Sequence, residues 1–251
     1  MNPFDLSGRF AIVTGANTGI GRAIAVGLAE AGADIVGVGR SAMTETEADV
    51  RRAGRAFVSI AADLSGPGIA GKVVADALAA GATPDILVNN AGIIRRADAL
   101  DFSEEDWDAV LDTNLKSVFF LCQAFAKAAL AAGRRAKIVN VASLLSFQGG
   151  IRVPSYTAAK SGLAGLTRLM ANEWAARGIN VNAIAPGYVE TNNTAALRAD
   201  AERSADILKR IPAGRWARPD DMAGAAVFLA APASDYVHGT ILPVDGGWLA
   251  R

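Results

Sequence analysis

The chain has 251 residues, of which 51% are hydrophobic and 20% are charged, and its 25 basic side chains balance 25 acidic ones. This neutral balance does not suggest nucleic acid or an anionic membrane as a partner. A single cysteine excludes an intrachain disulfide, and with a single histidine we expect no bound metal. The N-terminus has no basic start followed by an apolar run, and no uncharged apolar stretch of about 18 residues follows it. We therefore expect a cytoplasmic protein without a membrane span.

Short apolar runs alternate with longer amphipathic segments along the chain. In chain order we predict a strand at Phe10–Thr14, a helix at Gly21–Ala31, a strand at Asp34–Val38, a helix at Thr44–Gly54, a strand at Ala56–Ala61, a helix at Ile69–Ala80 and a strand at Asp85–Asn89. A helix follows that is capped by Ser103, breaks, and resumes through Asn114 to Ala132. The remaining elements are a strand at Lys137–Val141, a helix at Ser155–Arg177, a strand at Asn180–Ala185, helices at Arg203–Arg210 and Pro219–Ala230, and a strand at Thr240–Val244.

This alternation predicts an α/β fold: a single doubly wound, Rossmann-type domain over residues 1–251. Its seven-stranded sheet should be mostly parallel, with helices on both faces. Strands buried on both faces read as nearly continuous apolar runs, as Phe10–Thr14 and Asp85–Asn89 do. The segment Val189–Asp206 is polar and rich in alanine, and we predict a mobile lid there.

A glycine-rich turn, Gly15-Ala-Asn-Thr-Gly19-Ile-Gly21, joins the first predicted strand to the first predicted helix. Glycine allows a tight turn, a close approach of the backbone to a pyrophosphate, and close packing of helix on strand. The N-terminus of the helix also presents free N–H groups to phosphates. In this position the motif predicts a dinucleotide-binding site.

The tip of the second strand should meet the adenosine ribose of the dinucleotide. An acidic residue there binds the 2′-hydroxyl of NAD, whereas an arginine accepts the 2′-phosphate of NADP. The sequence has Gly39-Arg40 and no acid, which favours NADP. The alternative is that Arg40 is a solvated surface residue and the cofactor is NAD. Asp63, at the end of the third strand, is a candidate contact for the adenine ring.

Tyr156 and Lys160 stand four residues apart in a predicted helix, so they share one face. A free phenol has a pKa of about 10, and a nearby ammonium favours the phenolate. Tyr156 could then move the hydroxyl proton when a secondary alcohol and a ketone are interconverted. Ser143 precedes the tyrosine in the chain and could orient the reacting oxygen.

These motifs occur together with Asn89-Asn-Ala-Gly92, Asn114 and Pro186-Gly187, and over essentially its whole length the chain resembles the short-chain dehydrogenase/reductase family. The resemblance implies a nicotinamide cofactor, a homotetramer, and a water held by Asn114 that links Lys160 to solvent. The residues expected to be catalytic are Asn114, Ser143, Tyr156 and Lys160. The residues expected to bind the cofactor are Gly15, Asn17, Thr18, Gly19, Ile20, Gly21, Arg40, Asp63, Leu64, Asn90, Ala91, Gly92, Tyr156, Lys160, Pro186, Gly187, Val189 and Thr191.

Several segments, among them ILVNNAGIIRRADAL, NAIAPGYVETNN and VDGGWLAR, resemble one group of that family. This group is the 2-deoxy-D-gluconate 3-dehydrogenases, also called 2-dehydro-3-deoxy-D-gluconate 5-dehydrogenases. The resemblance implies an oxidoreductase acting on a deoxy sugar acid. The group is associated with NAD and lacks an arginine after the second strand, so Arg40 departs from its pattern. Two alternatives are a 3-oxoacyl or general carbonyl reductase and, from another class, a non-catalytic nucleotide-sensing protein.

A sugar-acid substrate brings a carboxylate, which the planar fork of an arginine binds in a bidentate manner. Arg152 lies four residues before Tyr156 and is the first candidate, with Arg95 and Arg96 as second candidates. Gln148 could bind sugar hydroxyls. The residues expected to bind the substrate are Arg95, Leu145, Gln148, Arg152 and Tyr156.

Overall fold

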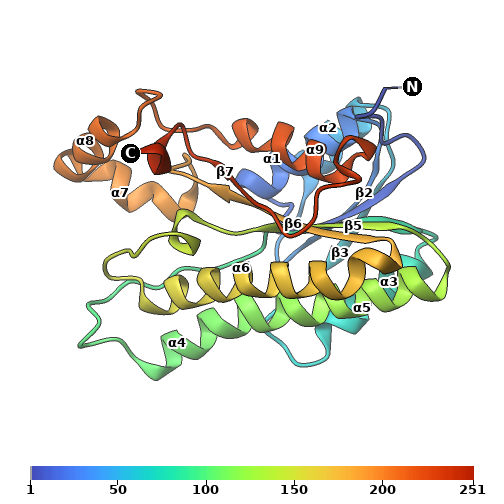
Figure 1. The fold of residues 1–251 in the computed structure, drawn as a ribbon, viewed down its shortest axis with the longest axis horizontal. Coiled ribbons are helices and arrows are strands. Elements are labelled where there is room, and N and C mark those ends of the chain that lie inside the picture. The colour runs from blue at the N-terminus through green and yellow to red at the C-terminus, as the bar shows by residue number, and fades with distance from the viewer. Residues whose placement is uncertain (1) are drawn as a thin grey trace.

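The computed structural model describes residues 2–251, which form a seven-stranded sheet in the order β3-β2-β1-β4-β5-β6-β7 (Figure 1). The strands are β1 (Phe10–Thr14), β2 (Asp34–Gly39), β3 (Phe57–Ala61), β4 (Pro84–Asn89), β5 (Ala136–Val141), β6 (Ile179–Pro186) and β7 (Ile241–Val244). Each neighbouring pair is parallel. The predicted doubly wound sheet is confirmed. The prediction was a mostly parallel sheet, and all seven strands are in fact parallel.

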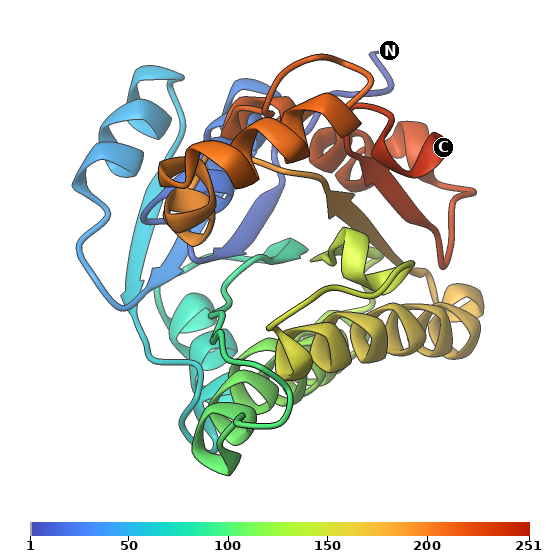
Figure 2. The ribbon, with the colours of Figure 1, turned by 90° about the vertical axis from the view of Figure 1, so that its left-hand side faces the viewer.

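Helices cover both faces of the sheet, as the two perpendicular views show (Figures 1 and 2). One face carries α1 (Gly19–Glu30), α2 (Thr44–Arg52) and α9 (Ala223–Ala230). The other face carries α3 (Ile69–Ala79), α5 (Ser117–Ala131) and α6 (Pro154–Trp174), with α4 (Glu104–Leu111) packed against α6. The short α7 (Ala195–Ala199) and α8 (Ala201–Arg210) lie at one end of the molecule. Within residues 2–251, no helix is both long enough and apolar enough to cross a membrane.

The hydrophobic core consists of two layers, one on each face of the sheet. Successive side chains of a strand point to opposite faces. On β1, Ile12 therefore packs with the helices α3, α5 and α6, while Ala11 and Val13 pack with α1 and α9. Strands buried in this way favour apolar residues at most positions, which explains the nearly continuous apolar runs of the sequence.

Three local features refine the predicted elements. The hydroxyl of Ser103 accepts a hydrogen bond from the Asp106 N–H (3.2 Å), which confirms the predicted N-cap of α4. The predicted break near Asn114 is a π-helical turn at Asp112–Lys116, a form that often occurs at functional sites. The predicted lid is helical in part: α8 begins at Ala201, because Asp200 accepts a hydrogen bond from the Arg203 N–H (3.0 Å).

Candidate active site

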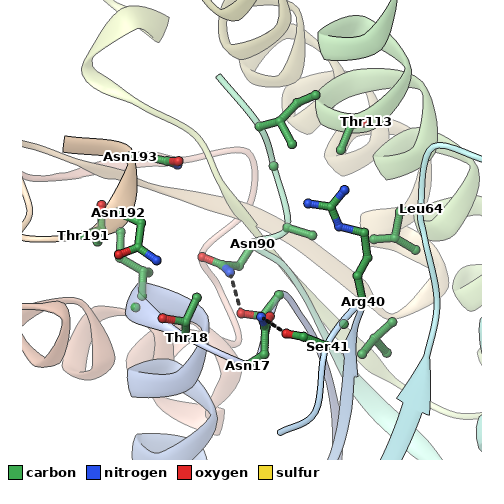
Figure 3. Close-up of a pocket in the computed structure, with 18 of the residues that line it drawn as sticks. Asn17, Thr18, Arg40, Ser41, Leu64, Asn90, Thr113, Thr191, Asn192 and Asn193 are labelled. Carbon is green, nitrogen blue, oxygen red and sulfur yellow. Dashed lines mark hydrogen bonds between the residues drawn. The ribbon is translucent and has the colours of Figure 1, made fainter. Parts of the chain in front are cut away.

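A cleft of about 820 Å³ opens at the carboxyl ends of β1 to β4. The strand order reverses between β1 and β4, and ligands of open parallel sheets bind at such a switch point. Figure 3 shows Arg40, Ser41 and Leu64 on one side, Thr191, Asn192 and Asn193 on the other, and Asn90 between them. The predicted cofactor-binding residues that line the cleft are Gly15, Asn17, Thr18, Gly19, Ile20, Arg40, Asp63, Leu64, Asn90, Ala91, Gly92 and Thr191.

The glycine turn is closed by tight contacts that exclude a side chain. Gly15 has a φ of 67°, and a Cβ there would lie 2.7 Å from the Asn90 amide nitrogen. A Cβ on Gly21 would collide with the Gly15 carbonyl oxygen, so Gly21 serves the packing of the turn and does not line the cleft. The N-cap residue of α1, Thr18, makes no side-chain hydrogen bond to the first turn of the helix. The N–H groups of this first turn are therefore available to the phosphates of a dinucleotide.

Thr14 and Asn90 join the ends of β1 and β4 beneath the glycine turn. The Thr14 hydroxyl oxygen accepts hydrogen bonds from the backbone N–H groups of Asn90 (2.9 Å) and Ala91 (3.0 Å). The Asn90 side-chain amide donates to the Thr14 carbonyl (3.0 Å). These bonds fix the floor of the cleft. Thr14 directly precedes the glycine-rich turn and was not among the residues predicted to form the site.

Arg40 lies at the end of the cleft formed by β2 and β3. Its side chain is 68% exposed, and its Nη1 lies 3.9 Å from the Asp63 carboxylate. The pKa of Asp63 is lowered first by hydrogen bonds from the N–H and hydroxyl of Ser65 and then by the charge of Arg40. Next to Arg40, the Ser41 hydroxyl accepts a hydrogen bond from the Asn17 amide (2.8 Å) (Figure 3). The cleft thus ends in an exposed guanidinium beside a hydroxyl, a pair suited to a phosphate.

Tyr156 and Lys160 lie together in the first turns of α6. The Lys160 Nζ is 5.6 Å from the centroid of the Tyr156 ring and donates a hydrogen bond to the Val141 carbonyl (2.6 Å). Burial raises the pKa of Tyr156 to about 12, against the lowering effects of the Ser143 hydroxyl and of the Arg96 charge. Burial lowers the pKa of Lys160 to about 8. Neither residue is among those that line the cleft, so the structure does not bring every predicted cofactor contact into it.

Ser143 is held close to this pair by the loop that follows β5. Its hydroxyl accepts a hydrogen bond from the Leu145 N–H (3.2 Å) and caps a 3₁₀ turn at Leu144–Ser146. The Ser146 hydroxyl then donates to the Lys160 carbonyl (2.7 Å). These bonds fasten the loop to α6 and bring Ser143 to Tyr156.

Asn114 is completely buried in the π-helical turn. Its side-chain oxygen accepts from the Ile93 N–H and its amide donates to the Ile93 carbonyl, both at 2.8 Å. A Cβ on Gly92 would lie 3.0 Å from the Asn114 side-chain oxygen, which explains the small residue there. The side chain of Asn114 therefore anchors the loop after β4, and its predicted role in holding a water stays a prediction.

The arginines near the site differ in their partners. Arg95 lines the cleft and pairs with Asp106 (3.0 Å). Arg152 adopts a left-handed backbone (φ 62°), is largely exposed, and pairs with Asp98 (3.2 Å). Arg96 donates to the Asn193 carbonyl (2.8 Å), and among residues 2–251 no carboxylate lies within 4.0 Å of its guanidinium.

The other predicted residues lie around the cleft without lining it. Val189 is 3% exposed, and a Cβ on Gly187 would come within 2.7 Å of the Asp245 backbone, so both residues support the end of β6. Pro186 is the last residue of that strand. Further lining residues were not among the predicted contacts, and most are small or polar residues in loops without a motif: Ser41, Ser65, Ile93, Thr113, Glu190 and Arg198. In the described part of the chain, no group of three His, Cys, Asp or Glu side chains could hold a metal ion.

Replacing Lys160 with methionine should stabilise the cofactor-free protein at pH 7 by about 2 kcal/mol. The lowered pKa means that burying the charged ammonium of Lys160 costs about 3 kcal/mol of folding free energy. About 1 kcal/mol is offset because the Val141 carbonyl loses its donor. In the wild-type protein this cost is fully present below a pH of about 8, and it disappears as the pH rises to 10.5, the pKa of the lysine in the unfolded chain. The stabilisation by Lys160→Met should therefore be smaller at pH 9 than at pH 7. Denaturant unfolding at the two pH values measures it.

The matched control is Lys72→Met, because Lys72 is an exposed lysine that pairs with Asp76 on α3. It should leave the free energy of unfolding nearly unchanged. A Lys160→Met protein less stable than wild type at pH 7 would show that the lysine carries no burial penalty.

The fold and the cleft together define a dinucleotide-binding oxidoreductase, since a glycine turn at the switch point of a parallel sheet is adapted to a dinucleotide. Residues 15–249 match the family described as enoyl-(acyl carrier protein) reductase, and the chain belongs to the short-chain dehydrogenase/reductase family. This is the family that the sequence motifs resemble, and its members are dehydrogenases and reductases.

Relatives cover the whole chain. The 2-dehydro-3-deoxy-D-gluconate 5-dehydrogenase of Escherichia coli (strain K12) has 59% sequence identity to this chain, over 100% of this chain and 99% of the length of that protein. A protein from Agrobacterium tumefaciens, whose crystal structure contains bound NADP, has 64% sequence identity to this chain. The two structures have a TM-score of 0.92 over 100% of both chains. A gluconate 5-dehydrogenase of Burkholderia cenocepacia J2315, in complex with NADP and tartrate, is 40% identical, with a TM-score of 0.94 over 100% of this chain and 98% of that one.

Proposed function

We propose that the chain is an NADP-dependent dehydrogenase that interconverts a secondary alcohol and a ketone of a deoxy sugar acid of the 2-dehydro-3-deoxy-D-gluconate type. The observation that carries the proposal is Arg96: its guanidinium has no carboxylate partner among residues 2–251, and its charge acts on the Tyr156 phenol. The full-length similarity to the Escherichia coli dehydrogenase of that name supports the substrate class.

In this proposal Tyr156 moves the proton of the reacting hydroxyl. With a pKa of about 12, its phenol is protonated at neutral pH and is ready to donate a proton to the oxygen of a ketone. In the opposite direction the phenolate accepts the proton. Ser143 orients the reacting oxygen, and Lys160 with Asn114 supports the site from the side of α6 and the π-helical turn. The bound nicotinamide supplies or accepts the hydride.

The preference for NADP rests on Arg40 and its neighbours. The guanidinium is exposed at the adenosine end of the cleft, and the Ser41 hydroxyl beside it is held by Asn17. A guanidinium and a hydroxyl can both donate to a 2′-phosphate. The related structures from Agrobacterium tumefaciens and Burkholderia cenocepacia with NADP support this choice, and NAD is the alternative.

Arg96 is the residue that we propose for the substrate carboxylate, ahead of Arg152 and Arg95. The two others already face Asp98 and Asp106, and a carboxylate that displaced either aspartate would gain little. Among residues 2–251, the Arg96 guanidinium binds only the neutral Asn193 carbonyl in the predicted lid, so a substrate carboxylate can pair with it without competition.

Arg96→Ala should raise the KM for a sugar acid by about tenfold, as expected when a charged group loses its partner. Arg152→Ala should raise it much less, because Arg152 is exposed and paired with Asp98. An uncharged analogue that lacks the carboxylate should show no such difference between the two variants. Steady-state kinetics with both substrates measure the effect, and equal changes in the two variants would count against the assignment.

The proposed function is tested by following the absorbance of the reduced cofactor. 2-Dehydro-3-deoxy-D-gluconate is supplied with NADP or NAD, and the diketone formed by its oxidation, or an acyl ketone, is supplied with NADPH or NADH. Turnover of the sugar acid with NADP is the expected result. Faster turnover of acyl ketones would favour a 3-oxoacyl or general carbonyl reductase instead. No turnover of any alcohol or ketone would leave a nucleotide-sensing protein as the alternative.

We further propose that the chain is a single-domain, cytoplasmic protein that forms a homotetramer. The oligomer is supported by apolar side chains on the outer surfaces of α5 and α6. Phe120 is 47% exposed and Leu169 is 45% exposed, and neither lines the cleft. Such side chains on neighbouring helices are suited to contacts between subunits. Light scattering of the purified protein gives the oligomer mass.

A further inference from the structure

The carboxyl-terminal segment Asp245–Arg251 binds the part of the chain around α8. The Gly246 carbonyl accepts a hydrogen bond from the Ala213 N–H (2.9 Å), and the Arg251 guanidinium donates to the Lys209 carbonyl (3.0 Å). Asp245 accepts hydrogen bonds from the N–H groups of Gly247 (2.8 Å) and Leu249 (3.0 Å), which fixes the turn that carries Trp248. Figure 1 shows this end of the chain beside α8, at the edge of the molecule.

The indole of Trp248 is buried between α8 and the loop that carries Ser143. It is 4% exposed, its ring lies 4.7 Å from the Tyr188 ring, and the Arg210 guanidinium at the end of α8 stacks on it at 4.1 Å. Tyr188 also packs on Trp216, with ring centroids 5.4 Å apart. Leu144, directly after Ser143, belongs to the same cluster. Trp248 therefore packs on α8 and shares a cluster with the loop that carries Ser143.

The indole N–H of Trp248 donates a hydrogen bond to the Gln148 side-chain oxygen (3.1 Å). An indole can only donate, so it binds the oxygen of the amide and determines which end of Gln148 is turned toward it. The NH₂ group of Gln148 then has two donors and no partner among residues 2–251. Gln148 belongs to the same tight turn as Ser143, because its N–H donates to the Leu144 carbonyl (3.1 Å).

We propose that Trp248 is a positioning residue for substrate binding: its N–H holds the Gln148 oxygen so that the Gln148 NH₂ group donates to an oxygen of the sugar acid. The inference rests on the proposed function, since it takes a hydroxylated acid as substrate. A site built around such a donor discriminates against substrates that lack the matching oxygen, because its polar group is then left unpaired. The packing on Arg210 joins this contact to the end of α8.

The test is a double-mutant cycle of Trp248→Phe and Gln148→Ala. Phenylalanine keeps a ring against Tyr188 and Arg210 and removes the N–H. Each single variant should raise the KM for 2-dehydro-3-deoxy-D-gluconate by about 3- to 10-fold, the value of one hydrogen bond, with kcat and the KM for NADP nearly unchanged. The double variant should be no worse than either single one, since both remove the same contact. Effects that multiply in the double variant would overturn the proposal.

The matched control is Trp216→Phe, a second tryptophan of the same aromatic cluster whose N–H has no hydrogen-bond partner in residues 2–251. It should leave the KM for the sugar acid unchanged, and an increase equal to that of Trp248→Phe would reduce the role of Trp248 to packing. As a readout without substrate, Gln148→Ala should shift the indole N–H resonance of Trp248 and not that of Trp216. An unshifted Trp248 resonance also overturns the proposal.

These experiments separate the proposed function from the positioning role of Trp248. If the wild-type protein turns over no sugar acid, the proposed function fails, and with it the substrate contact of Gln148, whatever the state of the Trp248 resonance. If it turns over the sugar acid and Trp248→Phe has the kinetics of wild type, only the role of Trp248 fails.

Discussion

Replacing Tyr156 with phenylalanine is expected to lower kcat by about 10²–10⁴-fold, the usual contribution of a general acid or base. The substitution removes the phenolic oxygen and keeps the ring beside the Lys160 Nζ, 5.6 Å away. The affinity for NADPH should change little, because the phenolic group is not part of the cleft lining. Steady-state rates with the sugar acid measure the first effect, and a fluorescence titration of NADPH measures the second.

The same prediction has a pH signature in the wild-type protein. Burial keeps the pKa of Tyr156 at about 12, although the Ser143 hydroxyl and the Arg96 charge lower it. The protonated phenol required for reduction of the ketone is therefore fully present around neutral pH, whereas the phenolate required for oxidation becomes more abundant as the pH rises. Oxidation should accelerate with pH while reduction does not. A Tyr156→Phe protein with the same pH dependence as wild type would show that another group moves the proton.

The elements of the fold follow from local patterns that a sequence displays directly. Strands buried on both faces are mostly apolar, and Gly15 and Gly21 of the turn after β1 are required by contacts closer than a Cβ allows. The start of α1 is less visible: the helix begins at Gly19, inside the glycine motif, where the prediction began it at Gly21. Helix ends depend on hydrogen bonds to the turn, and residue type alone does not reveal them.

The partners of the site residues depend on the path of the chain in space. Four residues of separation suggested that Arg152 faces the substrate with Tyr156, but its left-handed backbone and the carboxylate of Asp98 give it another partner. The contact of Trp248 with Gln148 joins positions that are 100 residues apart. No periodicity or spacing can predict such a pair, because it arises from the way the carboxyl-terminal segment returns to the active-site loop.

Arg40→Asp is expected to reverse the preference between the two nicotinamide cofactors. The guanidinium is 68% exposed at the end of the cleft, and hydrogen bonds between charged groups contribute about 1.5–3 kcal/mol each. Losing such a contact lowers kcat/KM with NADPH by about 10- to 100-fold, and the new carboxylate adds repulsion of the 2′-phosphate. With NADH, an aspartate at this position can accept hydrogen bonds from the ribose hydroxyls, so kcat/KM should rise.

The control for Arg40→Asp is Arg51→Asp, which makes the same change of charge on α2, where Arg51 pairs with Glu47 at the surface. It should leave the ratio of kcat/KM for NADPH and NADH unchanged, because exposed charges far from the phosphate are screened by salt. If Arg40→Asp also leaves this ratio unchanged, Arg40 is only a solvated neighbour of Asp63, and Ser41 with Asn17 must distinguish the cofactors. A loss with both cofactors alike would instead point to the 3.9 Å contact between Arg40 and Asp63 as a support of the adenosine end of the cleft.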